Sequence, residues 1–342
     1  MTEFLFQYGL FLAKAVTFVA AAGATTLVIV ALSRKGSAVG HLTVEKLNNS
    51  LRELTAPLRQ AALSKAEWKK ESKREEKQRK AAEKSADKAE PKPRVFVIDF
   101  KGDIRATAVS SLREEITAVV SLATARDEVV LRLENFGGAV HEHGLAASQL
   151  ARLRSRGIPL TAIVDKGAAS GGYMMACVAN RIIAAPFAVV GSIGVIAQIP
   201  NFNRALTDRG VDFEQVTAGK YKRTVTMFGR NTEEDRAKLR EELEEVHALF
   251  KNMVVANRPQ LDIEAVATGE HWYGTRALEL RLIDELGSSD DYLLAATERA
   301  DVFHVTYKAR HSLQERLLAA VRAAADQVEL WIAQRQKERS LP

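Results

Sequence analysis

The chain has 342 residues, of which 46% are hydrophobic and 27% charged, enough for one large domain or two modest ones. The formal net charge is +6, but residues 65–94 alone carry twelve Lys or Arg against seven Asp or Glu. Because most of the surplus lies in one segment, the basic pI is no argument for a nucleic-acid-binding domain, and we expect no nucleic-acid partner. The single cysteine, Cys177, excludes an intramolecular disulfide and is expected to be a small core residue.

The N-terminal segment contains a run of 18 uncharged residues, 15–32, rich in Val, Ala, Leu and Ile. As a helix this run is just long enough to cross the hydrocarbon core of a bilayer. A cleaved signal peptide is the alternative, since Ala20-Ala21-Ala22 is similar to a cleavage site, but the apolar run continues beyond it and the preceding residues are hardly basic. We therefore predict a retained transmembrane helix within residues 1–33.

The orientation of this anchor is ambiguous. Arg34, Lys35, Lys46 and Arg52 follow it, whereas only Lys14 precedes it. Read literally, the positive-inside rule places the rest of the chain in the cytoplasm.

Residues 34–94 are polar and helix-prone, and they end in a tract of Lys, Glu and Ala followed by Pro91-Lys92-Pro93. The sequence predicts a charged helical or disordered spacer there. Contact with anionic lipid head groups beside the anchor is the alternative reading.

Residues 95–308 show alternating strand and helix patterns, which predict an α/β domain with helices covering a sheet. The apolar segment 188–197 is broken by glycines and reads as buried strands and turns. Thr232 and Asp235 form a capping-box pattern that opens a long amphipathic helix. The sequence predicts a terminal amphipathic helix over residues 309–342, expected to pack on its own domain, with a membrane surface or another subunit as alternatives. The other expected strands are 95–100, 129–133, 158–165, 181–186, 213–218 and 302–307, and the other helices lie at about 112–123, 144–156, 277 and 290–300.

One short segment carries the parts of an acyl-transfer site. Ser170 follows the expected strand 158–165 and precedes Gly171-Gly172 and a helical pattern. A serine at such a turn offers a hydroxyl nucleophile beside free backbone N–H groups that can bind an oxyanion. The plain alternative is that Ser170 only caps a helix and the glycines only permit close packing.

A nucleophilic serine needs a base, and the residues leave several candidates open. His143 or His141 with Asp165 could complete a triad, and His141-Glu142-His143 could bind a metal, but neither has a supporting signature. A lysine is the stronger candidate, provided that burial or a nearby cation lowers its pKa. The spacing alone does not separate Lys220 from Lys222.

Three separated motifs resemble the signal peptide peptidase A family: Ala168-Ala169-Ser170-Gly171-Gly172-Tyr173, Gly191-Ser192-Ile193-Gly194-Val195 and Gly219-Lys220-Tyr221-Lys222-Arg223. With the anchor and the spacer, the resemblance covers nearly the whole chain. It implies a Clp-protease/crotonase-like fold of repeated ββα units, and a serine peptidase with neither metal nor cofactor.

The resemblance also implies roles for individual residues. Ser170 matches the nucleophile, Lys222 the general base and acid, and Ser192 a hydroxyl that orients the lysine. The N–H of Gly171 and one from Gly137-Gly138 match the oxyanion hole. Members of the family form ring-like oligomers, which implies a homo-oligomer with the active site between neighbouring subunits.

Two features depart from the family's pattern. The turn before the oxyanion glycines usually reads Ser-Pro-Gly-Gly, and here it is Asn135-Phe136-Gly137-Gly138. Losing the proline removes a fixed φ, which weakens the preorganisation of this donor. The family also implies a catalytic domain on the periplasmic side of a bacterial inner membrane, against the charge bias around the anchor.

The sequence thus predicts a membrane-anchored serine endopeptidase with a Ser–Lys dyad, acting on peptides or on misfolded or membrane-derived polypeptides. A catalytically weak or inactive membrane scaffold of the same fold is one alternative. A crotonase-type acyl-CoA enzyme, which would need neither Ser170 nor Lys222, is the other.

Overall fold

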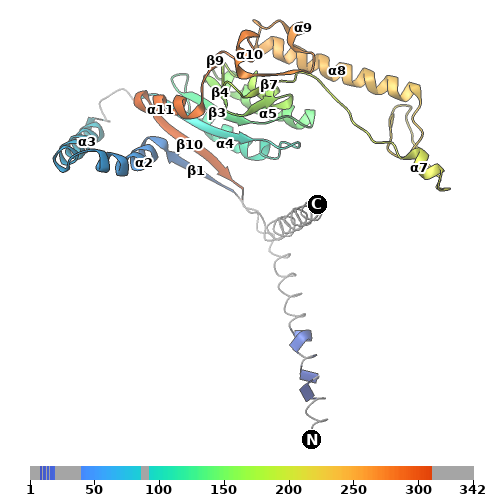
Figure 1. The fold of residues 1–342 in the computed structure, drawn as a ribbon, viewed down its shortest axis with the longest axis horizontal. Coiled ribbons are helices and arrows are strands. Elements are labelled where there is room, and N and C mark those ends of the chain that lie inside the picture. Colours follow the sequence, from blue (N-terminus) through green and yellow to red (C-terminus); the bar gives the residue numbers. More distant parts are fainter. Residues whose placement is uncertain are drawn as a thin grey trace, which may run out of the picture. The chain divides into compact units, whose positions relative to one another are not determined.

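The computed structural model describes residues 40–85 and 92–309, together with residues 8, 9, 11, 12, 14 and 16–19. The chain divides into two units, one of Met1–His41 with Lys308–Pro342 and one of Leu42–Tyr307. The second unit contains the sheets and helices discussed below (Figure 1). Among the described residues no helix is both long and apolar enough to cross a membrane. Most of the predicted anchor and nearly all of the predicted terminal helix lie outside the described residues.

A seven-stranded sheet organises the second unit and confirms the α/β prediction. Its strand order is β1-β10-β2-β3-β4-β6-β9, and neighbouring strands from β10 to β9 all pair in parallel. Parallel strands are joined by crossover segments that cover the faces of the sheet, so both faces become buried. The strands are β1 (His41–Lys46), β2 (Arg94–Lys101), β3 (Glu128–Glu134), β4 (Leu160–Val164), β6 (Arg181–Ala184), β9 (Glu285–Leu286) and β10 (Asp301–Lys308).

Alternating side chains of the strands build two separate cores. On one face, Phe96, Ile98 and Phe100 of β2 pack with the helices α4 (Val109–Leu122), α5 (Val140–Arg154) and α6 (Gly171–Ala176). On the other face, Val95 and Val97 pack with α11 (Ser289–Arg299). The period of two along a strand accounts for this division.

A second, three-stranded sheet lies after β4 in the chain and carries the Ser170 turn. Its order is β5-β7-β8, with β5 and β7 parallel and β7 and β8 antiparallel. The strands are β5 (Gly167–Ala169), β7 (Val189–Gly191) and β8 (His271–Tyr273). A parallel bridge between Asn135 and Ala168 joins the end of β3 to this sheet.

The segment that the sequence assigned to a spacer also contributes to the fold. β1 is the edge strand beside β10, and helix α2 (Leu47–Ala62) begins with Leu47 packed against the second core. The side chain of the buried Asn48 donates to the carbonyl oxygens of Thr297 and Ala300, and accepts the N–H of Val302. The sheet therefore begins before residue 95, where the sequence pattern had placed the start of the domain. Helix α3 (Lys65–Ser85) follows.

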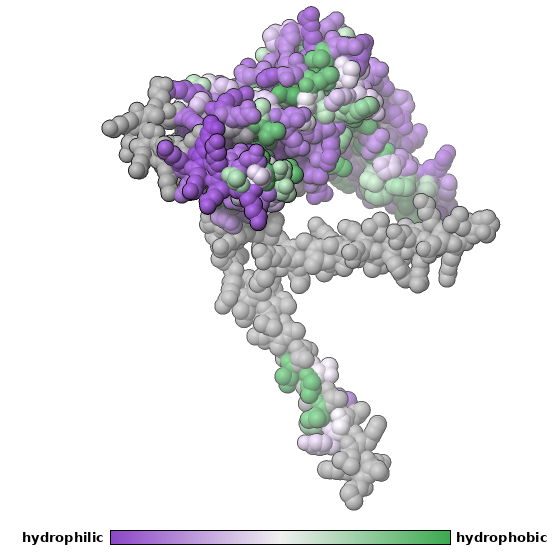
Figure 2. Space-filling model, turned by 60° about the vertical axis from the view of Figure 1, so that its left-hand side comes forward, coloured by the Kyte–Doolittle hydropathy of each residue, from purple (hydrophilic) through white to green (hydrophobic). Residues whose placement is uncertain are grey.

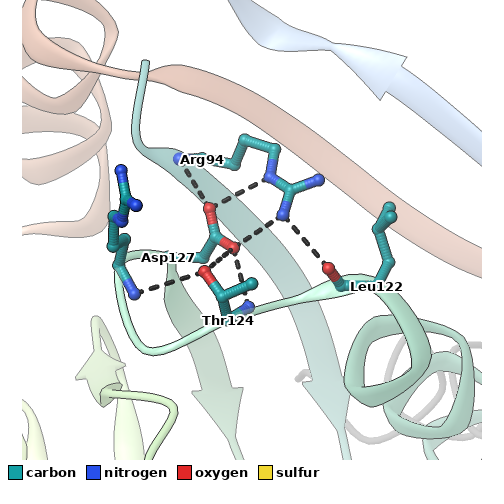
Figure 3. A network of polar contacts seen from close by, with 5 residues as sticks. Arg94, Leu122, Thr124 and Asp127 are labelled. Atoms are coloured by element: carbon teal, nitrogen blue, oxygen red, sulfur yellow. Dashed lines mark hydrogen bonds and ion pairs between the residues drawn. The ribbon is translucent and has the colours of Figure 1, made fainter. Parts of the chain in front are cut away.

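An ion pair fixes the start of β2 to the loop before β3 (Figure 3). Asp127 accepts hydrogen bonds from the backbone N–H, Nε and Nη2 of Arg94 at 3.1, 3.0 and 2.7 Å, and from the Thr124 N–H at 2.8 Å. Burial alone would raise the pKa of the Asp127 carboxyl, but these hydrogen bonds outweigh it and hold the pKa well below its ordinary value.

Residues 194–231, which we call the arm, have no buried residue. The arm contains the short helix α7 (Asn203–Thr207) and leads into the long helix α8 (Glu233–Asn257). The capping box of Thr232 and Asp235 is confirmed at the start of α8. In Figure 1 the α7 region lies at the beginning of α8, well away from the strands.

The predicted strand at 213–218 is wrong, because the structure has no strand in that part of the arm. Its apolar side chains meet no neighbouring strand, and Val216 is 95% exposed. Since β-propensity reflects packing against cross-strand neighbours, an apolar run without such a partner stays irregular. The short helices α9 (Ile263–Val266) and α10 (Gly274–Glu279) complete the fold.

Candidate active site

Ser170 lies between β5 and α6, at the junction that the sequence predicts. Its backbone N–H donates to the Gly191 carbonyl at 2.7 Å, and its own carbonyl accepts the first helical hydrogen bond from Met174 at 2.9 Å. The residue is half-buried. The turn is thus fixed on both sides while the side chain keeps access to solvent.

The backbone of Ser170 is in an unfavourable conformation, with φ 52° and ψ −118°. Residues other than glycine rarely adopt a positive φ, and such strain collects at functional sites. Although Ser170 occupies the N-cap position, its hydroxyl makes no capping hydrogen bond. The capping role, which was the plain alternative, therefore does not explain this serine.

The glycine turn at residues 137–138 packs directly against Ser170. A Cβ added to Gly137 would lie 2.7 Å from the Ser170 Cβ and 2.9 Å from the Gly171 nitrogen. A Cβ on Gly138 would lie 2.0 Å from the Ile104 carbonyl oxygen. Both glycines have a positive φ, 91° and 154°. The close approach and the backbone conformation both require glycine here.

The two glycines after Ser170 are equally constrained. A Cβ on Gly171 would meet the His143 ring at 2.4 Å, and one on Gly172 would meet the Asn135 carbonyl oxygen at 2.0 Å. The Gly138 and Gly171 N–H groups donate no hydrogen bond within the described part of the chain. They are therefore available as donors beside Ser170.

Ser192 follows the strand that holds Ser170. It also has a positive φ, 53°, and its N–H donates to the Glu270 carbonyl at 2.7 Å. Its hydroxyl donates to the Gly269 carbonyl at 3.3 Å. The β5–β7 pairing thus brings the Ser170 and Ser192 segments together, although they are far apart in sequence.

The two candidate lysines lie in the arm, and their environments differ. The Lys220 ammonium pairs with Glu234 at 2.8 Å and lies over the Tyr221 ring at 4.9 Å. The hydrogen bond to Glu234 raises the pKa of Lys220, which is the opposite of what a general base needs. Lys222 is exposed, and among the described contacts none joins it to Ser170.

The histidine alternatives are not assembled. His143 is buried, with Nδ1 2.9 Å from the Ala139 carbonyl oxygen and Nε2 3.3 Å from Asn135 Oδ1. Asp165 instead accepts hydrogen bonds from the N–H and hydroxyl of Ser289 at 2.8 and 2.6 Å. His141 is 83% exposed, so it cannot share a metal with the buried His143. Neither the triad nor the metal site is formed by these contacts.

Sequence reasoning treated Asn135 only as a departure from a pattern and missed its position. It lies at the end of β3 with no exposed surface, beside both glycine pairs. The available signal was an asparagine two residues before a glycine, a spacing at which the side chain can accept the N–H of the glycine. A strained serine, two backbone N–H groups without a partner in the described structure and a close-packed glycine turn form an arrangement suited to acyl transfer.

Comparisons with known proteins give matches over most of the chain. Residues 3–150 match the family described as peptidase family S49 N-terminal, and residues 152–303 match peptidase family S49. A Haemophilus influenzae protein named "Probable protease SohB" is 47% identical over 323 residues, 92% of each chain. A protein of the same name from Buchnera aphidicola (subspecies Acyrthosiphon pisum) is 55% identical over 230 residues, 67% of this chain and 68% of its own.

Two solved structures are also similar. The 1510-N membrane-bound stomatin-specific protease in complex with a substrate peptide covers 67% of this chain and 98% of its own, with 14% identity and a TM-score of 0.42. An enoyl-CoA hydratase/isomerase from Marinobacter aquaeolei covers 61% of this chain and 73% of its own, with 16% identity and a TM-score of 0.36. At these values neither structure bears on the activity of this chain.

Proposed function

This chain belongs to peptidase family S49, and we propose that it is a serine endopeptidase with Ser170 as nucleophile and Lys222 as general base. The observation that carries the proposal is the Ser170 turn, where the hydroxyl makes no capping hydrogen bond and the N–H groups of Gly138 and Gly171 have no partner among the described residues. A strained serine that caps nothing is poorly explained by packing and well explained by catalysis. The fold we propose is the Clp-protease/crotonase-like one.

The proposed reaction follows from these groups. Neutral Lys222 takes the proton of the Ser170 hydroxyl, and Oγ attacks the carbonyl carbon of the substrate peptide bond. The N–H groups of Gly171 and Gly138 donate to the oxyanion of the tetrahedral intermediate. Lys222 then protonates the leaving amine, and water hydrolyses the acyl-enzyme with the same lysine as base.

The choice of Lys222 over Lys220 rests on the resemblance of Gly219-Lys220-Tyr221-Lys222-Arg223 to the family motif, in which the second lysine matches the base. The ion pair of Lys220 with Glu234 supports the choice, because it favours the charged form of Lys220. In the active assembly we expect Ser192 to turn its hydroxyl towards Lys222 and hold it.

We propose that the active assembly is a homo-oligomer in which the arm of one subunit brings Lys222 to Ser170 of its neighbour. The arm has no buried residue, yet it carries several apolar side chains that no other part of the described structure covers. Figure 2 shows apolar patches interrupting an otherwise hydrophilic surface. Large exposed apolar areas mark interaction surfaces in soluble domains. The large hydrophobic residues of the arm that are between 41% and 95% exposed include Ile196, Phe202, Val211, Phe213, Val216, Tyr221 and Phe228.

We further propose that residues 1–33 anchor the protein in the bacterial inner membrane, with the catalytic domain in the periplasm. An anchored site would meet peptides released from the bilayer and misfolded polypeptides near it. The charges around the anchor favour the opposite orientation, with the domain in the cytoplasm. We propose the periplasm nevertheless, because long domains translocate largely regardless of flanking charge.

Labelling with a fluorophosphonate probe tests the nucleophile and the base. Wild type should label, and Ser170→Ala and Lys222→Ala should each abolish labelling. Lys220→Ala is the matched control: it removes a neighbouring lysine of the same loop and should leave labelling unchanged. Labelling that survives Lys222→Ala would exclude Lys222 as the base. A folded oligomer that never labels would favour the inactive scaffold.

Mixing the two inactive variants tests the shared site. If the base comes from a neighbour, Ser170→Ala and Lys222→Ala subunits assembled together should recover part of the wild-type labelling. Recovery requires one site with both wild-type residues, so a mixture that stays inactive while forming mixed oligomers would contradict a site shared between subunits.

A further inference from the structure

Asn135 connects the main sheet to the turn that carries Ser170. Its backbone N–H donates to the Gly167 carbonyl at 2.9 Å, and its carbonyl accepts the Ala169 N–H at 3.0 Å. Both partners belong to β5, the strand that ends at Ser170. Any movement of Asn135 is therefore transmitted to the nucleophile turn.

The Asn135 side chain determines which glycine N–H can bind an oxyanion. Its Oδ1 accepts the Gly137 N–H at 2.7 Å, closing an Asx turn. The Gly137 N–H is thereby used inside the protein, while the Gly138 N–H has no partner in the described structure. The same hydrogen bond restrains the peptide between residues 136 and 137, which directly precedes the peptide that carries the Gly138 N–H.

His143 packs the same turn against Gly171. The ring is fully buried in the first turn of α5, with Nδ1 2.9 Å from the Ala139 carbonyl oxygen and Nε2 3.3 Å from Asn135 Oδ1. Its carbon atoms lie where a Gly171 Cβ would be, at 2.4 Å from Cγ. The ring therefore sets the spacing between Asn135 and the backbone of Gly171.

We propose that Asn135 and His143 are positioning residues for the oxyanion hole, and that the Asn135 side chain supplies the restraint that a proline ring supplies in a Ser-Pro-Gly-Gly turn. Proline restrains such a turn by fixing φ, whereas Asn135 restrains it by a hydrogen bond across it. The inference rests on the serine peptidase function proposed above. The absence of a proline at position 136 then need not loosen the oxyanion hole. The hydrogen bond from the Gly137 N–H to Asn135 Oδ1 restrains the turn in place of the fixed φ.

The structure also allows the Asn135 hydrogen bond to be replaced by a proline at position 136. The Phe136 N–H donates no hydrogen bond in the described structure, so a proline at this position removes none. Asn135 lies in strand pairing, and the residue before a proline favours extended backbone. The double substitution Asn135→Ser with Phe136→Pro should therefore restore a rigid turn.

The test compares rates of fluorophosphonate labelling and peptide cleavage at a temperature where every variant is folded. Asn135→Ala should lower the labelling rate on the order of 10- to 100-fold, less than the loss of a whole oxyanion donor. It should lower kcat and leave KM nearly unchanged, because the oxyanion forms after binding. His143→Leu should act in the same direction. The double variant should recover most of the rate that Asn135→Ala loses.

Asn48 provides the matched control. It is another buried asparagine, with three hydrogen bonds to backbone groups at the end of α11 and the start of β10, away from Ser170. Asn48→Ala should lower stability as Asn135→Ala does, but leave the labelling rate unchanged. Equal labelling rates in Asn48→Ala and Asn135→Ala would overturn the proposal.

Amide hydrogen exchange separates this inference from the proposed activity. The Gly137 N–H should be protected in wild type, and its protection should fall in Asn135→Ala and not in Asn48→Ala. If wild type is folded and never labels, the peptidase function fails and the positioning role fails with it, even where the turn is protected. If wild type labels but Gly137 exchanges equally fast in all three proteins, only the positioning role is overturned.

Discussion

Ser170 donates its backbone N–H to the carbonyl oxygen of Gly191 over 2.7 Å, and this bond attaches the nucleophile turn to the Gly-Ser-Ile-Gly segment. Ser170 has a positive φ, and so does Ser192, which directly follows Gly191 in that segment. Two strained serines are thus held by one small sheet, the β5-β7-β8 sheet. Since strain persists only where surrounding contacts enforce it, this sheet is the rigid frame of the candidate site.

Gly137→Ala should strongly lower activity, because it displaces the glycine turn from Ser170. The new Cβ would lie 2.7 Å from the Ser170 Cβ and 2.9 Å from the Gly171 nitrogen, and the backbone has φ 91°. The turn must move away from Ser170, so we expect labelling to fall by about 100-fold or more. Fluorophosphonate labelling that is quenched at a series of times measures the labelling rate.

The control for this substitution is Gly157→Ala. Gly157 also has a positive φ, 69°, but no atom of the described residues lies within 4 Å of an added Cβ. It should cost about 1 kcal/mol of stability from backbone strain alone and leave labelling at the wild-type rate. If both substitutions slow labelling equally, the close contact of Gly137 with Ser170 has no functional meaning.

The parts of the fold with local signals could be predicted from the sequence. The apolar run at 95–100 predicts β2 because a parallel strand is buried on both faces. The capping box at Thr232 predicts the start of α8 because both of its hydrogen bonds are made by residues three apart. The Ser170 turn was found from one strand, two glycines and a helical pattern.

The parts that depend on distant partners could not be predicted. Residues 41–46 form a strand only because β10, more than 250 residues later, offers an edge. The reverse error occurred at 213–218, where an apolar run has no edge to join. The packing of His143 between Asn135 and Gly171 likewise follows from tertiary contacts that no spacing reveals.

Asp127→Asn should destabilise the second unit. The Asp127 side chain is 4% exposed and holds Arg94 and Thr124 in the network of Figure 3. Removing one partner of a largely buried pair leaves the guanidinium poorly compensated, so we expect a loss of about 2–4 kcal/mol in the free energy of unfolding. Urea denaturation at pH 7 measures it.

Glu264→Gln is the comparison for Asp127→Asn. Glu264 pairs with Lys251 at 3.1 Å, but its side chain is 77% exposed. Exposed pairs contribute little, so this substitution should change the free energy of unfolding by less than about 1 kcal/mol. A loss as large as that of Asp127→Asn would show that burial does not set the strength of these ion pairs.

Asp99→Asn should reduce the acid sensitivity of the fold. Burial raises the pKa of Asp99, but hydrogen bonds from His304 and Arg132 outweigh burial and lower the pKa to about 2. Because the folded pKa lies below the unfolded value of about 4, the stabilisation is present above pH 4 and is lost as the pH falls towards 2. Wild type should therefore lose stability over this range and the variant should lose less.

The Asp99 side chain is 44% exposed, so solvent screening limits the difference to about 1 kcal/mol. Urea unfolding at pH 7 and pH 3 checks it, and an equal acid dependence in both proteins would contradict the role of Asp99.

Cys177 should report the opening of the helix that follows Ser170. The thiol is fully buried at the end of α6, and burial raises its pKa to about 12. Since the thiolate is the reactive form, a disulfide reagent at pH 8 should modify the native protein only slowly, and one thiol per chain should react rapidly in guanidinium chloride. Under native conditions, the slow reaction rate should follow the equilibrium between closed and open forms.

Asn135→Ala should increase this rate of Cys177 modification if the turn and α6 open together, and an unchanged rate would show that the turn loosens while α6 stays packed. Rapid modification of the native protein would contradict the burial of Cys177.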